Sequence, residues 1–596
     1  MRTPSHRLTG FFLTVVTAVA LFSSTVVHPF FYDDIPYVAK NPAIRSLTTI
    51  PGAFLHPFSP AAPGLYRPVT TMSYTLQYAL FGLDPRGYHA TNVLLHAFVS
   101  GLLFLFAFRM FRSVPGALAT SLLFAVHSVH TEAVAWVSGQ SELLAAFFAL
   151  LSILSFLRFR ETKGGISSFF LVLSALLYFL AIGSKEIAAP LPLLLPLTQR
   201  LVFSSSAKKS SFIKQYLPYG VFALALALSL ILRFIALDGF SVPLLQVRMA
   251  GLSFLERMLL MLPVLVHYLR LMVFPVGLRL EYDWTTFPFW MSLGAGFFLF
   301  GIGALTTWCW RKGRAGSTSL PAGKAGSPQA RTPLQTMGFG IFWFFLFLLP
   351  VANIIPIGEL VAERFLYLPS IGFCLLVGAL VQKYVPRVRA QHAVPLLLIL
   401  MFFSFLTIRR NAEWSNPETL WWSTLTFSPN APHALQNLTA ILLAKGELKE
   451  SGQLLERGFA QFPESPLFYF QGGQWALANG DRARAERLFT EALRLARPED
   501  IGFTDLQRGI AFLELGQLPE AVQLFQYALE ANPFDPVILN NLGVVQAHLG
   551  NVTEAKEFFT QAIALFEAES SLNEEDRKNL AGARENLKML LRSTKN

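Results

Sequence analysis

The chain has 596 residues, of which 53% are hydrophobic and 56 are Phe, and its formal net charge is +11 at pH 7. A mean hydropathy of +0.46 excludes an ordinary soluble domain and predicts a multispanning membrane protein. Most basic residues lie in loops between apolar stretches, so the positive charge does not indicate nucleic-acid binding. The two cysteines lie in apolar segments and predict neither a disulfide framework nor a zinc site.

Eleven apolar stretches before residue 410 are predicted to cross the membrane. A further stretch, residues 258–276, is interrupted by His267, Arg270 and Pro275. The basic loops fall on one side of the membrane only if this stretch does not cross, so we expect it to lie in the interface or to re-enter. The first stretch is expected to remain as an uncleaved helix. The predicted crossings are 8–27, 92–111, 115–136, 141–158, 167–183, 187–203, 216–236, 287–309, 338–356, 365–382 and 393–408.

The distribution of basic residues predicts the orientation. Arg2 and Arg7 place the N-terminus in the cytoplasm, so the first long loop, residues 28–91, lies outside. This loop is rich in Pro and aromatic residues and is expected to form a short amphipathic layer. Residues 311–337 are low in complexity and predict a flexible cytoplasmic linker. With eleven crossings, the C-terminal part lies on the outer face together with the 28–91 loop.

The C-terminal part, residues 415–596, repeats with a period of 34. Gly509 and Gly543 are separated by this period, as are Phe525 and Phe559. Such spacing of small and large residues is typical of tetratricopeptide repeats, whose paired helices bury a core by stacking. About four repeats predict an α-solenoid with a concave groove that binds a peptide or protein. A structural lid packed on the membrane part is the alternative.

Ionisable residues gather on the predicted outer face of the membrane part. Bare charges are costly near hydrocarbon, so such residues are functional candidates. Asp33 and Asp34 come directly after the first crossing. His127 and His130 have a spacing that suits metal ligands, but no third ligand follows in the sequence, which favours packing histidines. The other candidates that line the site are His130, Glu132, Lys185, Glu186, Glu363 and Arg364.

Each group also has a structural interpretation. Lys185 and Glu186 could form a local ion pair, and Glu363 with Arg364 could anchor a helix end. Asp33 and Asp34 could cap the segment that follows. A functional site explains why these groups lie on the same face, whereas separate structural roles do not.

Transfer of a sugar from a lipid phosphate fits these groups. The leaving phosphate is already acidic and needs only a cation or metal to stabilise its charge. The acceptor hydroxyl needs a carboxylate base, typically worth about 10²–10⁴-fold in rate. Asp33 and Asp34 opposite Arg364 or Lys185 would supply both functions. The sequence does not decide whether a divalent cation such as Mg²⁺ or Mn²⁺ is a cofactor, and no other cofactor is expected.

Five stretches of the sequence resemble a known family. They are residues 32–42, 65–70, 88–96, 126–134 and 362–370. Together with the order of a polytopic part followed by repeats, they resemble the transmembrane and tetratricopeptide-repeat (TMTC-type) protein O-mannosyltransferases. The resemblance implies a GT-C fold, a polyprenyl-phosphate-linked sugar donor, and an acidic catalytic motif in the first outer loop. Asp33 and Asp34 match that motif.

The sequence therefore predicts an all-α protein with a membrane glycosyltransferase domain (1–410) and a repeat domain (415–596). We expect an inverting enzyme that moves a hexose such as mannose to protein Ser or Thr hydroxyls, with the acceptor bound in the repeat groove. The small number of repeats resembles a bacterial relative, in the inner membrane with its site on the periplasmic face. A glycan or lipid acceptor stays open. Alternatives are a scaffold that recruits envelope proteins, or a transporter, although no inverted repeats are present.

Overall fold

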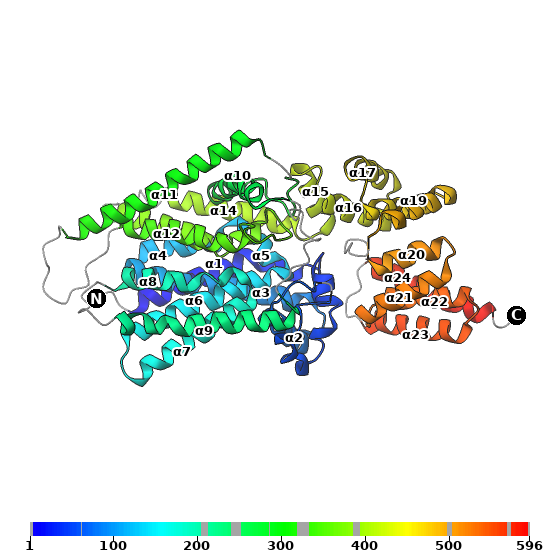
Figure 1. Ribbon diagram of the computed structural model, residues 1–596, viewed down its shortest axis with the longest axis horizontal. Helices are drawn as coiled ribbons and strands as arrows, with labels where there is room; N and C mark the ends of the chain where they lie inside the picture. Colours follow the sequence, from blue (N-terminus) through cyan, green and yellow to red (C-terminus); the bar gives the residue numbers. More distant parts are fainter. Residues whose placement is uncertain are drawn as a thin grey trace.

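The computed structural model describes residues 4–60, 62–203, 212–239, 252–284, 287–318, 333–384, 394–497, 504–568 and 574–593. Every element longer than an isolated bridge in these ranges is helical, so the predicted all-α class is confirmed. The long helices lie side by side in one bundle, and α15–α24 form a second body at one end of it (Figure 1). We call this end of the bundle the outer end. The N-terminus lies at the opposite end.

Eight helices of the described residues are long and apolar enough to cross a membrane. Three shorter apolar helices lie among them, namely α4 (Val114–Val126), α8 (Leu191–Val202) and α13 (Ser370–Tyr384). The long and short helices correspond to the eleven predicted stretches, while the number of crossings stays a prediction. The long helices are α1 (Pro4–Phe22), α3 (Pro85–Phe111), α6 (Gln140–Glu161), α7 (Gly165–Ser184), α9 (Phe212–Ala236), α11 (Phe289–Thr318), α12 (Pro333–Leu348) and α14 (Val394–Glu413).

The predicted linker 311–337 overlaps two of these helices. Its first residues continue α11 and its last residues begin α12. The remainder, residues 319–332, lies outside the described residues. The basic residues Lys208, Lys209, Arg387 and Arg389, which belong to loops predicted to face the cytoplasm, also lie outside them.

The predicted stretch 115–136 is not one continuous helix. After α4, His127 adopts an extended conformation, and the Val129 amide donates to its Nδ1 (3.4 Å). A single turn (Ser128–His130) and the short helix α5 (Thr131–Ala135) follow. Because of this interruption, the segment from Ser128 to Ala135 lies at the outer end, where Glu132 is completely buried. The break was not predicted because apolar residues lie before it in α4 and again after it at Ala133 and Val134.

Helix α10 (Phe254–Val273) lies across the bundle. It is seen nearly end-on in Figure 1, whereas α11, α12 and α14 run along the bundle. Val264 and Leu271 are buried, while Phe254 and Leu255 are about three-fifths exposed. The direction of α10 agrees with the expectation that 258–276 does not cross the membrane.

The first outer loop forms a compact layer on the outer end. Val38, Ile44 and Phe58 from the loop pack with Tyr74 and Tyr88 in one small core. Helix α3 begins at Pro85, earlier than predicted, and thereby carries Tyr88 into the layer. The elements of the layer are one π-helical turn (Ile35–Ala39), the turns Pro42–Ile44, Leu47–Thr49 and Gly52–Phe54, and α2 (Pro68–Phe81).

The C-terminal body consists of stacked helix pairs that explain the 34-residue period. In successive pairs, a Cβ added to Gly473, Gly509 or Gly543 would lie 2.6 Å from a Phe ring of the paired helix. Glycine is therefore needed at these positions for close helix packing. The pairs are α16 (Pro432–Lys445) with α17 (Leu448–Gln461), α18 (Pro466–Ala478) with α19 (Arg482–Leu495), α20 (Asp505–Glu514) with α21 (Leu518–Ala531), and α22 (Pro536–His548) with α23 (Val552–Ala568). Helix α15 (Pro417–Phe427) precedes them and α24 (Glu574–Ser593) follows.

The repeat body is joined to the outer end of the bundle by a shared apolar core. Trp136 and Leu280 of the membrane part pack with Leu420, Trp421 and Leu435 of α15 and α16. An ion pair from Lys40 Nζ to Asp535 Oδ2 (2.7 Å) adds a second attachment, between the first loop and α22. The repeats and the first loop therefore lie on the same end, as the predicted orientation requires.

Helices α12 and α13 approach closely at two glycines, which gives a first prediction. A Cβ on Gly340 would lie 2.5 Å from the carbonyl oxygen of Gly372. We expect Gly372→Val to destabilise the bundle by about 1–3 kcal/mol through overpacking, measured as a lower thermal midpoint in detergent. Gly294→Val on α11 is the control, because a Cβ there meets nothing within 4 Å. Equal midpoints for the two variants would contradict the packing argument.

Candidate active site at the outer end of the bundle

Asp34 is held by hydrogen bonds on both carboxylate oxygens. Its Oδ1 accepts from the Ser138 amide (2.7 Å) and the Ser138 hydroxyl (2.6 Å), and its Oδ2 accepts from the Phe31 amide (3.1 Å). The side chain is fully buried. Asp34 thus ties the first loop to the start of α6. Burial raises the pKa of Asp34 to about 7, and these hydrogen bonds oppose the rise.

Asp33 has a different environment. It is half-buried, and no described residue hydrogen-bonds to its carboxylate. The residue before it, Tyr32, has a left-handed backbone (φ 52°), which costs energy in a residue with a Cβ. Strain of this kind is common next to functional groups, where it aims a side chain. The charge of Arg364 acts on the Asp33 carboxylate, whereas Ser138 donates its hydrogen bonds to Asp34.

The charges around Asp33 come from several segments. Burial raises the pKa of the Asp33 carboxyl to about 6, and the positive charge of Arg364 opposes the rise. The negative charge of Glu359 adds to the rise, while His433 and Arg67 lower the pKa. A carboxylate with a pKa near 6 is ionised at neutral pH and still basic enough to accept a proton.

Arg364 is bound to Glu132 and lies against the rings of Trp136 and Phe365. Its side chain pairs with Glu132 Oε1, and its backbone amide donates to Glu132 Oε2 (2.8 Å). Its guanidinium lies 5.3 Å from the centre of the Trp136 ring, and that ring stacks on Tyr32 at 6.2 Å. The contacts place Arg364 within the same cluster as the strained residue before Asp33.

Two further cations complete the cluster. Lys185 Nζ pairs with Glu142 Oε1 at the start of α6, in a pair with almost no solvent exposure. Lys185 and Arg364 lie 5.4 and 5.3 Å from the centre of the same Phe365 ring. Arg67 lies 3.4 Å from Glu186, and its buried Nε has no hydrogen-bond partner among the described residues.

These residues make a cluster of paired charges near the Asp33 carboxylate. Arg67, Lys185 and Arg364 come from three separate segments, and each is paired with a carboxylate. Fixed cations in a partly dry site stabilise an anion that develops during a reaction. Cations of this kind and the Asp33 carboxylate are the groups that would be needed to stabilise a phosphate and to accept a proton.

Two of the predicted site residues lie elsewhere. His130 packs between helices, with Nδ1 2.8 Å from the Phe124 carbonyl oxygen and Nε2 2.9 Å from the Ser370 hydroxyl. Glu363 points away from Arg364, and its Oε1 accepts from the Tyr282 hydroxyl (3.1 Å). The structure thus brings together Asp33, Asp34, Glu132, Lys185, Glu186 and Arg364.

The described residues do not assemble a recognisable metal site. No group of three or more His, Cys, Asp or Glu side chains in the described ranges could hold a metal ion. His127 and His130 are engaged with carbonyl and hydroxyl oxygens and with aromatic rings. Their spacing therefore reflects packing in this part of the chain.

Sequence reasoning missed four members of the cluster, Arg67, Ser138, Glu142 and Glu359. Arg67 lies in the stretch 65–70 that carried the family resemblance, so its signal was present but was not assigned a role. Glu142 lies at the start of the predicted crossing 141–158, but the sequence does not show that it pairs with Lys185. Nothing in the sequence indicates that Ser138 binds Asp34, because the two residues lie on different segments and meet only in the fold.

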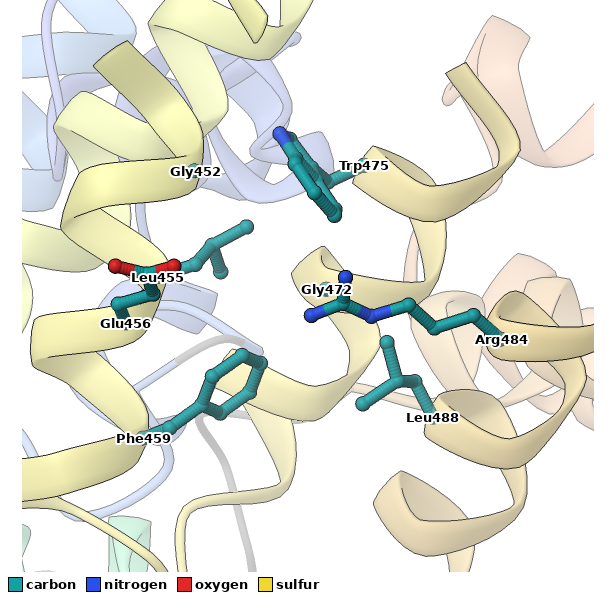
Figure 2. Close-up of a pocket in the computed structure, with 8 residues that line it drawn as sticks. All are labelled: Gly452, Leu455, Glu456, Phe459, Gly472, Trp475, Arg484 and Leu488. Carbon is teal, nitrogen blue, oxygen red and sulfur yellow. The ribbon is translucent and has the colours of Figure 1, made fainter. Parts of the chain in front are cut away.

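The repeat body carries a separate pocket between α17 and α19, with α18 as its floor. It contains about 240 Å³ of empty space, part of which is open to solvent. Figure 2 shows Arg484 reaching from α19 across the pocket toward α17. Its guanidinium lies 4.9 Å from the centre of the Trp475 ring, and the Trp475 indole donates to the Leu448 carbonyl (2.7 Å). The pocket is smaller than a typical small-molecule site and fits a single side chain.

Comparisons with known proteins agree with the arrangement of bundle and repeats. A tetratricopeptide repeat family model matches residues 506–570. The chain is 26% identical to human protein O-mannosyl-transferase TMTC3, over 71% of this chain and 49% of that protein. It is 26% identical to Drosophila melanogaster protein O-mannosyl-transferase Tmtc1, over 75% and 61%. The resemblance to the TMTC-type family is confirmed.

A third relative and one solved structure extend these findings. Protein O-mannosyl-transferase F38B6.6 of Caenorhabditis elegans is 27% identical, over 75% of this chain and 62% of that protein. The chain thus spans about half to three-fifths of the length of the curated relatives it matches. The tetratricopeptide-repeat protein TTC0263 of Thermus thermophilus aligns with 20% identity and a TM-score of 0.23, over 32% of this chain and 97% of that chain.

Proposed function

We propose that the protein is a membrane glycosyltransferase that moves a hexose such as mannose from a polyprenyl phosphate to a Ser or Thr hydroxyl of a protein. The main support is Asp33 at the outer end of the bundle, a half-buried carboxylate that has no hydrogen-bond donor among the described residues and is influenced by the charge of Arg364. A base next to buried cations at a membrane edge suits a donor whose lipid lies in the bilayer and whose sugar lies at the surface. The names of the relatives support the same reaction class.

In the proposed reaction, Asp33 accepts the proton of the acceptor hydroxyl as the hydroxyl oxygen attacks the anomeric carbon of the sugar. The bond between that carbon and the phosphate oxygen breaks, and the lipid phosphate leaves with the electron pair. Arg364, Lys185 and Arg67 stabilise the phosphate charge, so no acid is needed to protonate the leaving group. A single displacement inverts the configuration at the anomeric carbon.

Asp34 has a different role in this proposal. Its oxygens are occupied by Ser138 and Phe31, so it holds the loop in place and does not take the proton. The repeats lie on the same end as Asp33 and bind the acceptor polypeptide close to the site. A multi-pass protein with the cytoplasmic N-terminus predicted from Arg2 and Arg7 carries this end on the outer face, which is the periplasmic face in a bacterial inner membrane.

Sugar transfer by the purified full-length chain tests the proposal. Nanodiscs containing the wild type and Asp33→Asn/Asp34→Asn would be given a panel of polyprenyl-phosphate hexoses and a Ser/Thr-rich protein acceptor, with equal amounts verified. We expect one donor to be used by the wild type alone. Transfer to a glycan or lipid acceptor instead of the protein would correct the acceptor. No transfer with any donor and acceptor, while the double variant still functions in cells, would favour the scaffold.

The surroundings of Asp33 predict a pH dependence. The pKa of this carboxyl is raised to about 6, and the base is active only when ionised. Transfer at low donor concentration should therefore be constant above neutral pH and fall about tenfold per pH unit below about pH 6. The measurement is initial rate against pH, with thermal midpoints checked at each pH. A rate that increases on acidification would show that the required group is an acid.

The pocket on the repeats predicts an effect on acceptor binding alone. Arg484 is exposed on α19, so replacing it with Ala removes its contact with Trp475 without removing a buried side chain. We expect Arg484→Ala to raise KM for a long polypeptide acceptor several-fold and to leave kcat unchanged. Arg482→Ala, on the same helix but outside the pocket, is the control. An unchanged KM would remove the pocket from acceptor binding.

A further inference from the structure

The aromatic residues before the acidic pair pack into the repeat body. Tyr32 contacts the Trp421 ring edge-on (5.4 Å between ring centres) and the His433 ring edge-on (6.5 Å). Phe31 contacts the rings of Trp421 (5.5 Å) and Trp414 (6.2 Å). Trp421 lies in α15 and His433 in the first turn of α16. The segment that carries Asp33 is therefore anchored from the repeat side as well as from the membrane side.

His433 is itself fixed by the membrane part. Its Nδ1 lies 2.9 Å from Glu281 Oε1, and Glu281 Oε2 accepts from the Ala434 amide (3.1 Å). Glu281 belongs to the segment between α10 and α11, and its neighbour Leu280 lies in the shared apolar core. The first turn of α16 is thus docked at a defined position next to Tyr32.

We propose that the start of the repeat body is part of the active site, with Trp421 and His433 acting as positioning residues that hold Tyr32 in its left-handed conformation and so aim Asp33. The proposal rests on the glycosyltransferase function proposed above. Tyr32 needs such support because its conformation is unfavourable for a residue with a Cβ. Trp136 of the membrane part stacks on the Tyr32 ring, and Trp421 of the repeat body contacts the same ring edge-on.

The arrangement separates two roles of the repeats. The pocket at Trp475 would affect only how an acceptor binds, whereas Trp421 and His433 would affect the rate even for an acceptor too short to reach the repeats. A misdirected base lowers kcat, because small errors in the placement of reacting groups cost large factors in rate. The acceptor KM should not change, because neither side chain is proposed to bind the acceptor.

The test uses the full-length chain with a short Thr-containing peptide as acceptor. We expect His433→Ala and Tyr32→Ala to lower kcat by about 10- to 100-fold with KM unchanged. Tyr32→Phe keeps the ring contacts and should retain most of the rate. His548→Ala is the matched control, because His548 is an exposed histidine at the end of α22. Unchanged kcat in His433→Ala and Tyr32→Ala would overturn the proposal, as would a change in KM alone.

Amide hydrogen exchange provides a readout that does not depend on activity. The Ile35 amide donates to the Tyr32 carbonyl (3.1 Å) and the Tyr37 amide donates to the Asp33 carbonyl (3.0 Å). We expect both amides to exchange faster in His433→Ala and Tyr32→Ala but not in His548→Ala. Unchanged exchange in both variants would overturn the positioning role. Faster exchange in His433→Ala and Tyr32→Ala together with an inactive wild type would keep the positioning role and count against the proposed function.

Discussion

Asp33→Asn should lower sugar transfer by about 10²–10⁴-fold, the usual contribution of a general base. Asn has nearly the same shape as Asp and cannot take a proton from the acceptor. Because no described residue donates a hydrogen bond to Asp33, the substitution breaks no hydrogen bond. The free energy of unfolding should therefore stay within about 0.5 kcal/mol of that of the wild type. The rate should be measured with saturating donor, so that weaker donor binding does not contribute.

Asp34→Asn is the informative comparison for the adjacent residue. An Asn side chain can still accept from Ser138, but its amide group would face the Phe31 amide, and two donors cannot bond. We expect a loss of about 1–3 kcal/mol of stability and a rate loss of roughly tenfold, much smaller than that of Asp33→Asn. Equal rate losses with no loss of stability would show that Asp34 takes part in proton transfer.

Lys185→Met should lower both the stability of the protein and the rate of sugar transfer. Glu142 is completely buried, and its partner Lys185 has a side chain that is 3% exposed. Removing the cation leaves an unpaired buried carboxylate, which typically costs about 3–5 kcal/mol. Loss of one group that stabilises the leaving phosphate should also reduce the rate by about 10²–10³-fold. Thermal midpoint and single-turnover transfer measure the two effects separately.

The double variant Lys185→Met/Glu142→Gln distinguishes structure from chemistry. With both charges removed, the folding defect should largely disappear, while the rate stays low because the phosphate still lacks its cation. Arg482→Met, which breaks the exposed pair with Glu486, should change the midpoint little and serves as the control. If the double variant recovers both midpoint and rate, Lys185 serves only to hold α6 and α7 together.

Residue patterns predicted the fold well where one segment determines its own structure. The apolar stretches and the 34-residue period follow from local composition, and the helices appear where these signals lie. The break at His127 was missed because apolar residues continue before it and resume after it at Ala133 and Val134, so the stretch looked like one crossing. The expectation that 258–276 does not cross the membrane came only from the basic residues of distant loops. The stretch itself could not decide this, because a crossing helix and a surface helix can carry the same apolar face.

The candidate site was predictable in its residue types but not in its partners. Asp33, Lys185 and Arg364 could be identified because charges at a membrane edge are unusual. Their partners Glu132 and Glu142 come from different segments, and only the fold shows which acid meets which base. The difference between Asp33 and Asp34 depends on Ser138, more than a hundred residues away along the chain, and no local pattern encodes it.

The packing of Tyr32 against Trp421 has a consequence for the order of synthesis. Tyr32 emerges early and Trp421 follows about 390 residues later, which takes roughly 20–80 s at common rates of translation. During that interval the loop that carries Asp33 lacks one of its two supports. A chain whose synthesis stops before α15 would insert most of its helices and still hold its base in the wrong place. Under the proposed function, an incomplete copy would therefore occupy the membrane without transferring sugar.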